Sequence, residues 1–104
     1  MLESKIQTEI IHYLESNGYL VVKHIQTNRN GFPDLQALKD GQSIFIEIKR
    51  PNGKLSELQK YRLQQLTDKG FKCFIITSIN QLLNELSNHS SSELPKIRTF
   101  NDCN

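Results

Sequence analysis

Two extended segments joined by an Asp-Gly pair constrain the fold of this chain more than any other feature of its sequence. LQALK (35–39) precedes Asp40-Gly41, and QSIFIEIK (42–49) follows it. An Asp-Gly pair between two such segments is typical of a tight hairpin turn, because both residues tolerate a left-handed backbone. We therefore predict an antiparallel β-hairpin over residues 35–49.

The segments around the hairpin alternate between helical and extended patterns. Apolar residues at helical spacing predict three helices, and short β-branched or aromatic runs predict two more strands. The helices cover residues 3–17, 56–69 and 78–86, and the strands cover 19–25 and 71–77. The order is α-β-β-β-α-β-α. We expect the first three strands to form an antiparallel meander, and the last strand to run parallel to the third because a helix crosses back between them.

The last two predicted helices start with the same local pattern. Ser56 is followed three residues later by Gln59, and Ser78 is followed three residues later by Gln81. This is the spacing of a capping box, in which the two side chains satisfy backbone N–H groups at the start of a helix. We predict that each serine caps its helix.

Composition is typical of one globular domain. The 104 residues are 37% hydrophobic, and no apolar run approaches the roughly 20 residues that cross a bilayer. The start of the chain is acidic and has no apolar core, so we expect no secretory signal and no membrane contact. An intracellular location follows, in the cytoplasm of a bacterial or phage-infected cell or on its nucleoid. We expect one domain over residues 1–87 and an irregular tail over the Ser- and Asn-rich residues 88–104.

Two opposite charges interrupt the second strand of the hairpin. Because side chains alternate along a strand, Ile44, Ile46 and Ile48 share one face and Glu47 and Lys49 share the other. On a solvated face such a pair contributes less than about 1 kcal/mol. Considered alone, the pair is explained as an ordinary surface ion pair.

A second carboxylate precedes the first strand of the hairpin. Asp34 follows Pro33, and the hairpin folds its strand back onto the strand of Glu47, so the two carboxylates come near each other. Close carboxylates raise each other's pKa unless a cation lies between them, and oxygen ligands of this kind select Mg²⁺ or Mn²⁺. Alternatively, Asp34 only caps the loop, because Pro-Asp is common in turns.

The first predicted helix offers a third carboxylate. Glu3 lies on the helix face that carries the apolar residues, whereas Glu9 and Glu15 each lie about 120° away from Glu3. An acidic residue in the first turn is also favoured by the helix dipole alone, so both explanations of Glu3 stay open.

In combination, these residues resemble a known nuclease family. Glu3, GFPDL (31–35) and, after the Asp-Gly turn, FIEIKRPNGKLSELQ (45–59) occur in the order found in the VRR-NUC (virus-type replication-repair nuclease) family of the PD-(D/E)xK superfamily. The similarity spans about residues 3–78. It implies a metal-dependent nuclease of the α/β class, with a restriction-endonuclease-like core in which helices flank a mixed central sheet.

The resemblance also implies a metal centre. Asp34 and Glu47 match the family's metal ligands, and the backbone carbonyl of Ile48 matches a further ligand. Glu3 matches a carboxylate that acts on the metal or on its bound water. The implied cofactor is Mg²⁺ or Mn²⁺.

Two further residues match family positions with catalytic roles. Lys49 matches the group that orients the attacking water and offsets charge on the phosphorane, and it shares a strand face with Glu47. Gln59 matches a glutamine beside the site, but it fits equally well as the capping-box partner of Ser56. Both explanations of Gln59 stay open.

Basic residues flank the proposed site in two loops. Arg29 lies in NRNG, and Arg50 and Lys54 lie in RPNGK. We predict that these three contact DNA phosphates without reading bases, although each is also explained as a solvated cation. The solvated explanation is preferred for Lys60, Arg62 and Lys72. The histidines lack the spacing of a ligand set, and no role is assigned to His12, His24 or His89.

The resemblance implies a structure-selective DNA endonuclease for four-way (Holliday) junctions or other branched DNA in repair. A homodimer would supply two symmetric incisions. One alternative is a nuclease subunit of a repair or restriction complex that acts on flaps or nicked duplex. Another is a catalytically silent DNA-binding module. Asp34, Glu47 and Lys49 argue against the silent module, because close carboxylates repel phosphate unless a metal is bound.

Overall fold

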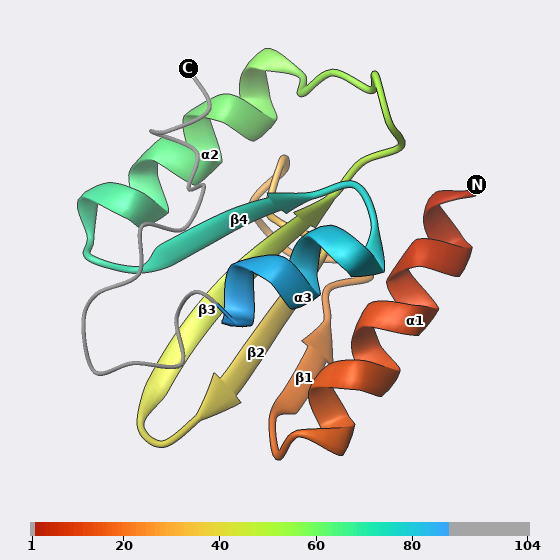
Figure 1. The fold of residues 1–104 in the computed structure, drawn as a ribbon. Coiled ribbons are helices and arrows are strands. Elements are labelled where there is room, and N and C mark those ends of the chain that lie inside the picture. The colour runs from red at the N-terminus through yellow and green to blue at the C-terminus, as the bar shows by residue number, and fades with distance from the viewer. Residues whose placement is uncertain (1, 88–104) are drawn as a thin grey trace.

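A computed structural model describes residues 2–87 as a four-stranded sheet with helices on both faces (Figure 1). The elements are α1 (Glu3–Ser16), β1 (Leu20–Lys23), β2 (Leu35–Lys39), β3 (Gln42–Ile48), α2 (Glu57–Asp68), β4 (Lys72–Ile76) and α3 (Ile79–Ser87). The predicted α/β class and the α-β-β-β-α-β-α order are confirmed. The predicted tail, 88–104, lies outside the described residues. None of the helices within 2–87 is long and apolar enough to cross a bilayer.

The sheet has the strand order β1-β2-β3-β4. β1 pairs with β2 and β2 with β3 in antiparallel fashion, and β4 runs parallel to β3, as predicted. At the hairpin turn, Asp40 and Gly41 have φ values of 54° and 78°. Both lie in the left-handed region that this turn requires, which explains why Asp-Gly is found there. β1 is shorter than predicted, because it covers Leu20–Lys23 and not residues 19–25.

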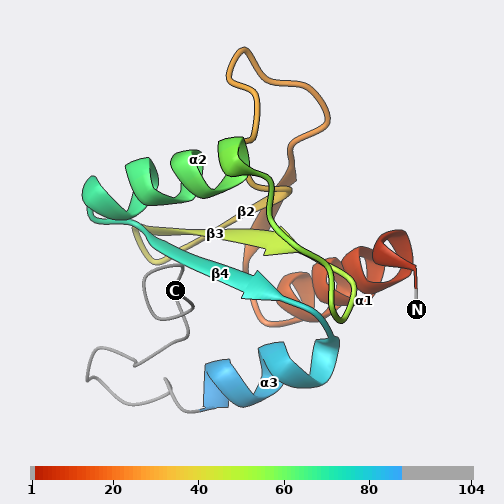
Figure 2. The ribbon, with the colours of Figure 1, turned by 90° about the horizontal axis from the view of Figure 1, so that it is seen from above.

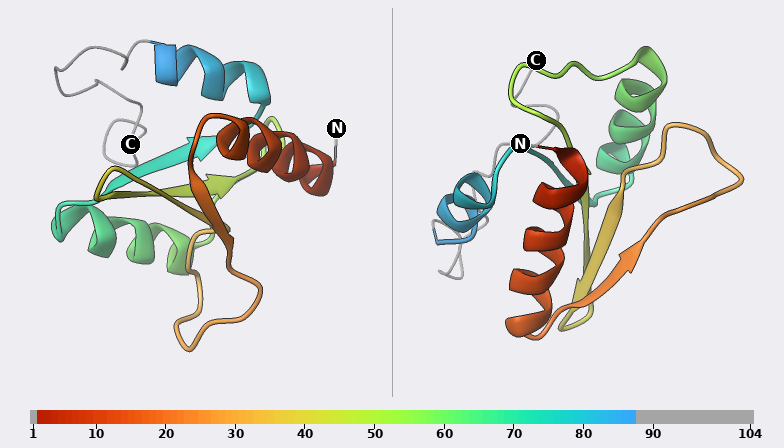
Figure 3. Two further views of the ribbon diagram at one scale, coloured as in Figure 1. Left: turned by 90° about the horizontal axis from the view of Figure 1, so that it is seen from below. Right: turned by 90° about the vertical axis from the view of Figure 1, so that its right-hand side faces the viewer.

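Two apolar layers pack against opposite faces of the sheet. α1 and α3 cover one face and α2 covers the other (Figure 2; Figure 3, left). The predicted alternation along β3 divides its side chains between these layers. The layer under α1 and α3 buries Ile6, Ile10, Leu14, Leu35, Ala37, Ile46, Ile48, Phe74, Ile76 and Leu82. The smaller layer under α2 buries Phe45, Leu63, Leu66 and Cys73.

Both predicted serine caps are present. Ser56 Oγ accepts a hydrogen bond from the backbone N–H of Gln59, and Gln59 Oε1 accepts one from the backbone N–H of Ser56, which completes a capping box. Ser78 Oγ likewise accepts from the backbone N–H of Gln81. There the glutamine Oε1 accepts from the backbone N–H of Thr77, one residue earlier than in a capping box. Each helix start is therefore defined locally.

Candidate active site

The carboxyl end of β3 brings Asp34 and Glu47 together. Leu35 pairs with Ile46 across the hairpin, so the preceding and following residues, Asp34 and Glu47, are next in register and project from one face. The backbone N–H of Ile48 donates to Asp34 Oδ2 over 2.9 Å. This hydrogen bond holds the Asp34 side chain against the end of β3.

Glu47 is an acidic side chain inside the layer under α2. Its side chain is 2% exposed. Gln59 Nε2 donates to its Oε2 over 3.1 Å, and Lys49 Nζ lies 3.8 Å from the same oxygen. The other oxygen, Oε1, is buried and has no hydrogen-bond partner among residues 2–87. A buried carboxylate oxygen without a partner is costly, so an additional group is needed at this position.

The pKa of Glu47 reflects this environment. The pKa is raised from 4.5 to about 8, mainly by burial and next by the negative charge of Asp34, while the Lys49 ammonium opposes the shift. A proton shared with the Asp34 carboxyl and the more distant charge of Glu3 add smaller upward contributions to the pKa. Without a cation, this environment therefore favours the protonated form of the Glu47 carboxyl group.

The two carboxylates, Asp34 and Glu47, fit a divalent cation that retains several bound water molecules. Within residues 2–87, no three His, Cys, Asp or Glu side chains converge as a ready metal cluster. Mg²⁺ is commonly bound by one or two carboxylates and completes its octahedron with water and other oxygens. Asp34 and Glu47 are two carboxylates of the kind that would hold such an ion, and Glu47 Oε1 would be available to it.

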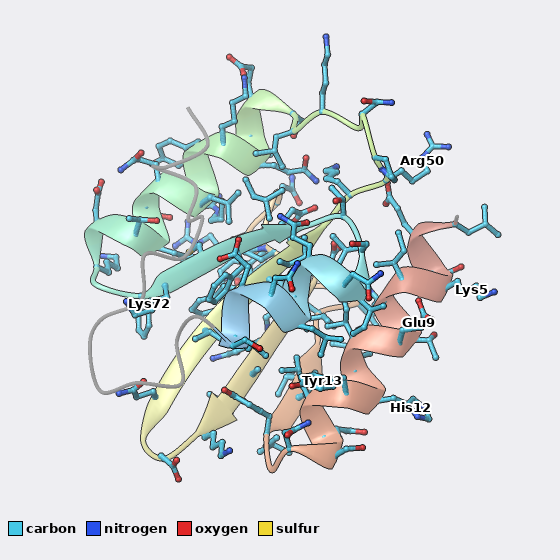
Figure 4. All side chains as sticks on the ribbon, in the orientation of Figure 1. Lys5, Glu9, His12, Tyr13, Arg50 and Lys72 are labelled. Carbon is cyan, nitrogen blue, oxygen red and sulfur yellow. The ribbon has the colours of Figure 1, made fainter. Side chains whose placement is uncertain are left out.

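Glu3 reaches the same end of the sheet from the first turn of α1. Its Oε2 accepts from the backbone N–H of Arg50 over 3.3 Å and lies 3.9 Å from Arg50 Nε. Figure 4 shows Arg50 beside this end of the helix. Both side chains are substantially exposed, so the ion pair itself contributes little stability. The structure thus places Glu3 at the margin of the site, bonded to Arg50.

Gln59 makes the contacts expected under both of the explanations that were left open. Its Oε1 completes the capping box with Ser56, and its Nε2 donates to Glu47. One side chain can do this because the two ends of the amide have opposite hydrogen-bonding character. The cap therefore fixes the direction from which the amide meets the carboxylate.

The three proposed phosphate-binding residues are exposed and lie in two connections at the same end of the sheet. Arg29 lies in the β1–β2 loop, which extends beyond the sheet on the side of α2 (Figure 2; Figure 3, right). Arg50 and Lys54 lie between β3 and α2. Because β1 and β3 both end where β2 begins, these connections flank Asp34 and Glu47.

The structure corrects the interpretation of Arg62 as a solvated surface cation. Arg62 is only 9% exposed, and its Nε and Nη2 both donate to the carbonyl oxygen of Asn30 over 3.2 Å. The adjacent Gly31 packs so tightly that a Cβ there would lie 2.8 Å from the backbone oxygen of Leu58. Arg62 thus binds the β1–β2 loop to α2. Its position four residues before Leu66, which is buried on the inner face of the helix, is the sequence signal for this burial.

The sequence patterns also assigned no role to His24. The structure places this half-buried ring between the β1–β2 loop and the sheet, in contact with the segment that carries Asp34. No spacing among the histidines could indicate this, because the contact is made with a backbone carbonyl.

The element order, the mixed sheet and the two carboxylates beside a lysine at a strand end define a nuclease-type α/β fold. Comparison with known proteins identifies the family. The model of the VRR-NUC domain matches residues 3–80, and the chain belongs to this family. A solved structure described as a VRR_NUC domain is similar with a TM-score of 0.76 and 27% sequence identity, over 84% of this chain and 96% of the other. A search of curated proteins gave no significant match.

Family membership has direct consequences for the protein's chemistry. The VRR-NUC family is nuclease-related and generally uses divalent metals, and a nuclease domain implies DNA binding. The predicted family and fold are therefore confirmed, while the roles of individual residues remain predictions.

Proposed function

We propose that this protein is a Mg²⁺- or Mn²⁺-dependent endonuclease that hydrolyses phosphodiester bonds in branched intracellular DNA, with four-way junctions as its preferred substrate. The observation that supports this most directly is the environment of Glu47. Its carboxyl group lies next to Asp34 with one buried oxygen unpartnered among residues 2–87, and the ionised form is unfavourable there unless a cation binds.

In this proposal Asp34, Glu47 and the backbone carbonyl of Ile48 hold the ion, and Glu3 acts on its water. The chemistry that the ion supplies when bound is activation of water and polarisation of a phosphate oxygen. Gln59 binds Glu47 Oε2 and thereby leaves Oε1 for the ion.

Lys49 acts beside this centre. Its Nζ lies 3.8 Å from Glu47 Oε2, and its side chain is 15% exposed, so the ammonium group is close to the carboxylate and accessible to a substrate. From there it donates to the attacking water and to a non-bridging phosphate oxygen, where negative charge develops during hydrolysis. Stabilising this charge in a partly dehydrated site is more effective than in bulk water.

Arg29, Arg50 and Lys54 bind the DNA backbone on either side of the scissile phosphate. Phosphate contacts fix position without reading sequence, which suits an enzyme that selects a DNA structure. A four-way junction presents two equivalent strands, and we propose that a homodimer with a twofold axis incises both.

A cleavage panel tests the proposal. Single-stranded, duplex, flap, nicked and four-way DNA are each incubated with Mg²⁺, with Mn²⁺ and with a chelator, and the oligomeric mass is measured in parallel. We expect cleavage of four-way DNA with either metal and none with the chelator. Preference for flaps or nicked duplex would contradict junction selectivity and leave the metal-dependent chemistry in place.

Substitutions separate catalysis from binding. Lys49→Ala and Asp34→Asn should bind four-way DNA in a mobility-shift assay and fail to cut it. The matched control is Glu15→Gln, which removes the charge of an exposed carboxylate near the last turn of α1. This variant should cut normally. If the wild-type protein binds DNA but no divalent metal supports cleavage of any substrate, the protein is a silent binding module and the proposal is wrong.

A further inference from the structure

His24, directly after β1, contacts the segment that carries Asp34 at two points. Its backbone N–H donates to the carbonyl oxygen of Asp34 over 2.8 Å. Its ring Nδ1 lies 2.9 Å from the carbonyl oxygen of Pro33. Because the Pro33 carbonyl belongs to the peptide group that precedes the Asp34 Cα, the two contacts fix the peptide groups on both sides of Asp34.

The ring of His24 is itself held in one orientation. The Phe32 ring meets it edge-on at a centroid distance of 5.0 Å, and the Phe45 ring lies at 6.5 Å with an interplanar angle of 24°. The ring's Nε2 lies 3.3 Å from Gln36 Oε1, and the amide nitrogen of Gln36 donates to Ser43 Oγ over 2.9 Å. Contacts from β2, from β3 and from the β1–β2 loop thus fix the orientation of the ring.

The residue type is explained by the Pro33 carbonyl. A carbonyl oxygen can only accept, so the contact with Pro33 is a hydrogen bond in the forms of His24 that carry a proton on Nδ1. A phenyl ring would pack beside Phe32 and Phe45 without burying nitrogen atoms that need hydrogen-bond partners. Compared with a phenyl ring, the imidazole of His24 adds a hydrogen-bond donor that points at the Pro33 carbonyl.

We infer that His24 is a positioning residue for the metal centre: its Nδ1–H holds the Pro33–Asp34 peptide group so that the Asp34 carboxylate stays against the Ile48 N–H. The inference rests on the proposed function. If the peptide group rotates, the carboxylate moves away from both Ile48 and Glu47. Outer-shell partners of metal ligands typically change metal affinity about 10–100-fold.

Three substitutions separate the hydrogen bond from the packing. His24→Asn places an amide nitrogen where Nδ1 lies and keeps the donor to Pro33. His24→Gln places its amide nearer the position of Nε2 and loses that donor. His24→Phe keeps the aromatic packing and has no donor. We expect Asn to behave as the wild type, and both Gln and Phe to be impaired.

The first measurement is amide hydrogen exchange in the protein without metal. The Ile48 amide reports directly on the Asp34 carboxylate, because it donates to Oδ2. Its exchange should accelerate on the order of tenfold in His24→Gln and His24→Phe, while the amide of Phe45 in the middle of β3 keeps its wild-type rate. Equal acceleration at Phe45 would show general destabilisation and overturn the inference.

The second measurement is the Kd for Mn²⁺ by calorimetry. It should rise about tenfold in His24→Gln and His24→Phe and stay unchanged in His24→Asn. Wild-type Ile48 exchange and Mn²⁺ affinity in His24→Phe, or equal behaviour of the Asn and Gln variants, would overturn the inference. Failure of the wild-type protein to bind Mn²⁺ would instead contradict the proposed function, and Ile48 exchange would still decide whether His24 positions Asp34.

Discussion

The starts of α2 and α3 carry the same Ser-x-x-Gln pattern in different surroundings. Both serines accept from the backbone N–H of the glutamine three residues later, and both glutamine Oε1 atoms accept backbone N–H groups. The free ends of the two amides differ. Gln59 Nε2 donates to the buried Glu47 carboxylate, whereas Gln81 Nε2 donates to the backbone carbonyl of Ile75 over 3.3 Å.

This difference shows that a local motif can define a helix start without defining its function. The capping interaction depends only on residues three apart. Whether the amide of the glutamine meets an ionisable group depends on where the helix is placed over the sheet. α2 begins beside the end of β3, so its cap serves the candidate site, while the cap of α3 joins that helix to β4.

The largest effect is expected when Glu47, the carboxylate that only the α2 cap contacts, loses its charge. Glu47→Gln keeps the shape of the side chain and takes away a proposed metal ligand. Cleavage should fall by more than about a thousandfold, beyond the 10–100-fold typical of outer-shell changes. Single-turnover cleavage of four-way DNA measures this. Retention of more than a tenth of wild-type activity would contradict the role of Glu47 as a ligand.

The second prediction concerns the stability of the metal-free protein as a function of pH. The pKa of Glu47 is raised from 4.5 to about 8 in the folded state, so the folded protein binds this proton more tightly than the unfolded chain. The resulting stability is fully present below pH 4.5 and is lost as the pH rises towards 8. The melting temperature should therefore fall over this range, with about 4–8 °C for each kcal/mol lost.

Glu47→Gln is the control for this pH dependence, because the amide does not titrate. The difference in melting temperature between pH 5 and pH 8 should be smaller in this variant than in the wild type. Adding Mg²⁺ to the wild-type protein at the higher pH should restore part of the loss, since a ligand of the folded state stabilises it. Parallel pH profiles for both proteins would show that Glu47 is not the titrating group.

A matched pair of substitutions compares the two caps directly. Gln59→Glu and Gln81→Glu both keep an oxygen that can complete the cap, because Glu serves in a capping box as Gln does. Only the first places a second negative charge against Glu47. Cleavage should fall about 10–100-fold in Gln59→Glu and stay near the wild-type rate in Gln81→Glu. Equal losses in both would mean that Gln59 acts only through the helix start.

The smallest effects are expected for the capping serines. Ser56→Ala and Ser78→Ala each remove one side-chain acceptor and should destabilise the fold by about 1 kcal/mol, measured by urea unfolding. Ser56→Ala should also reduce cleavage slightly, because Gln59 then loses part of its support. A larger loss of cleavage in Ser78→Ala than in Ser56→Ala would contradict the conclusion that the α2 cap supports the candidate site.

The order of elements and the pairing of the central strands were predictable because they depend on local chemistry. The Asp40-Gly41 turn permits the left-handed φ values that the hairpin needs, and it sets the register that brings Asp34 next to Glu47. The two-residue period of β3 then places Glu47 and Lys49 on one face. These residues could be selected before any coordinates were known.

Arg62 and His24 could not be assigned in this way. Both make their decisive contacts with backbone carbonyls of the β1–β2 loop, at Asn30 and Pro33. Such carbonyls occur all along the chain, so the sequence does not show which one each side chain meets; the helical spacing of Arg62 and Leu66 indicates only that Arg62 faces inward. The path of the loop over α2 decides which carbonyl is met.

The sequence by itself therefore determined the helices, the strands, the hairpin register and the carboxylate pair, since each follows from backbone preferences or from the alternation of side chains over a few residues. Only the tertiary structure decided that Glu47 is buried with an unpartnered oxygen among residues 2–87, that Gln59 serves both its cap and this carboxylate, and that Arg62 is enclosed. Burial and long-range hydrogen bonding depend on how separate elements pack, and those contacts join residues far apart in the chain.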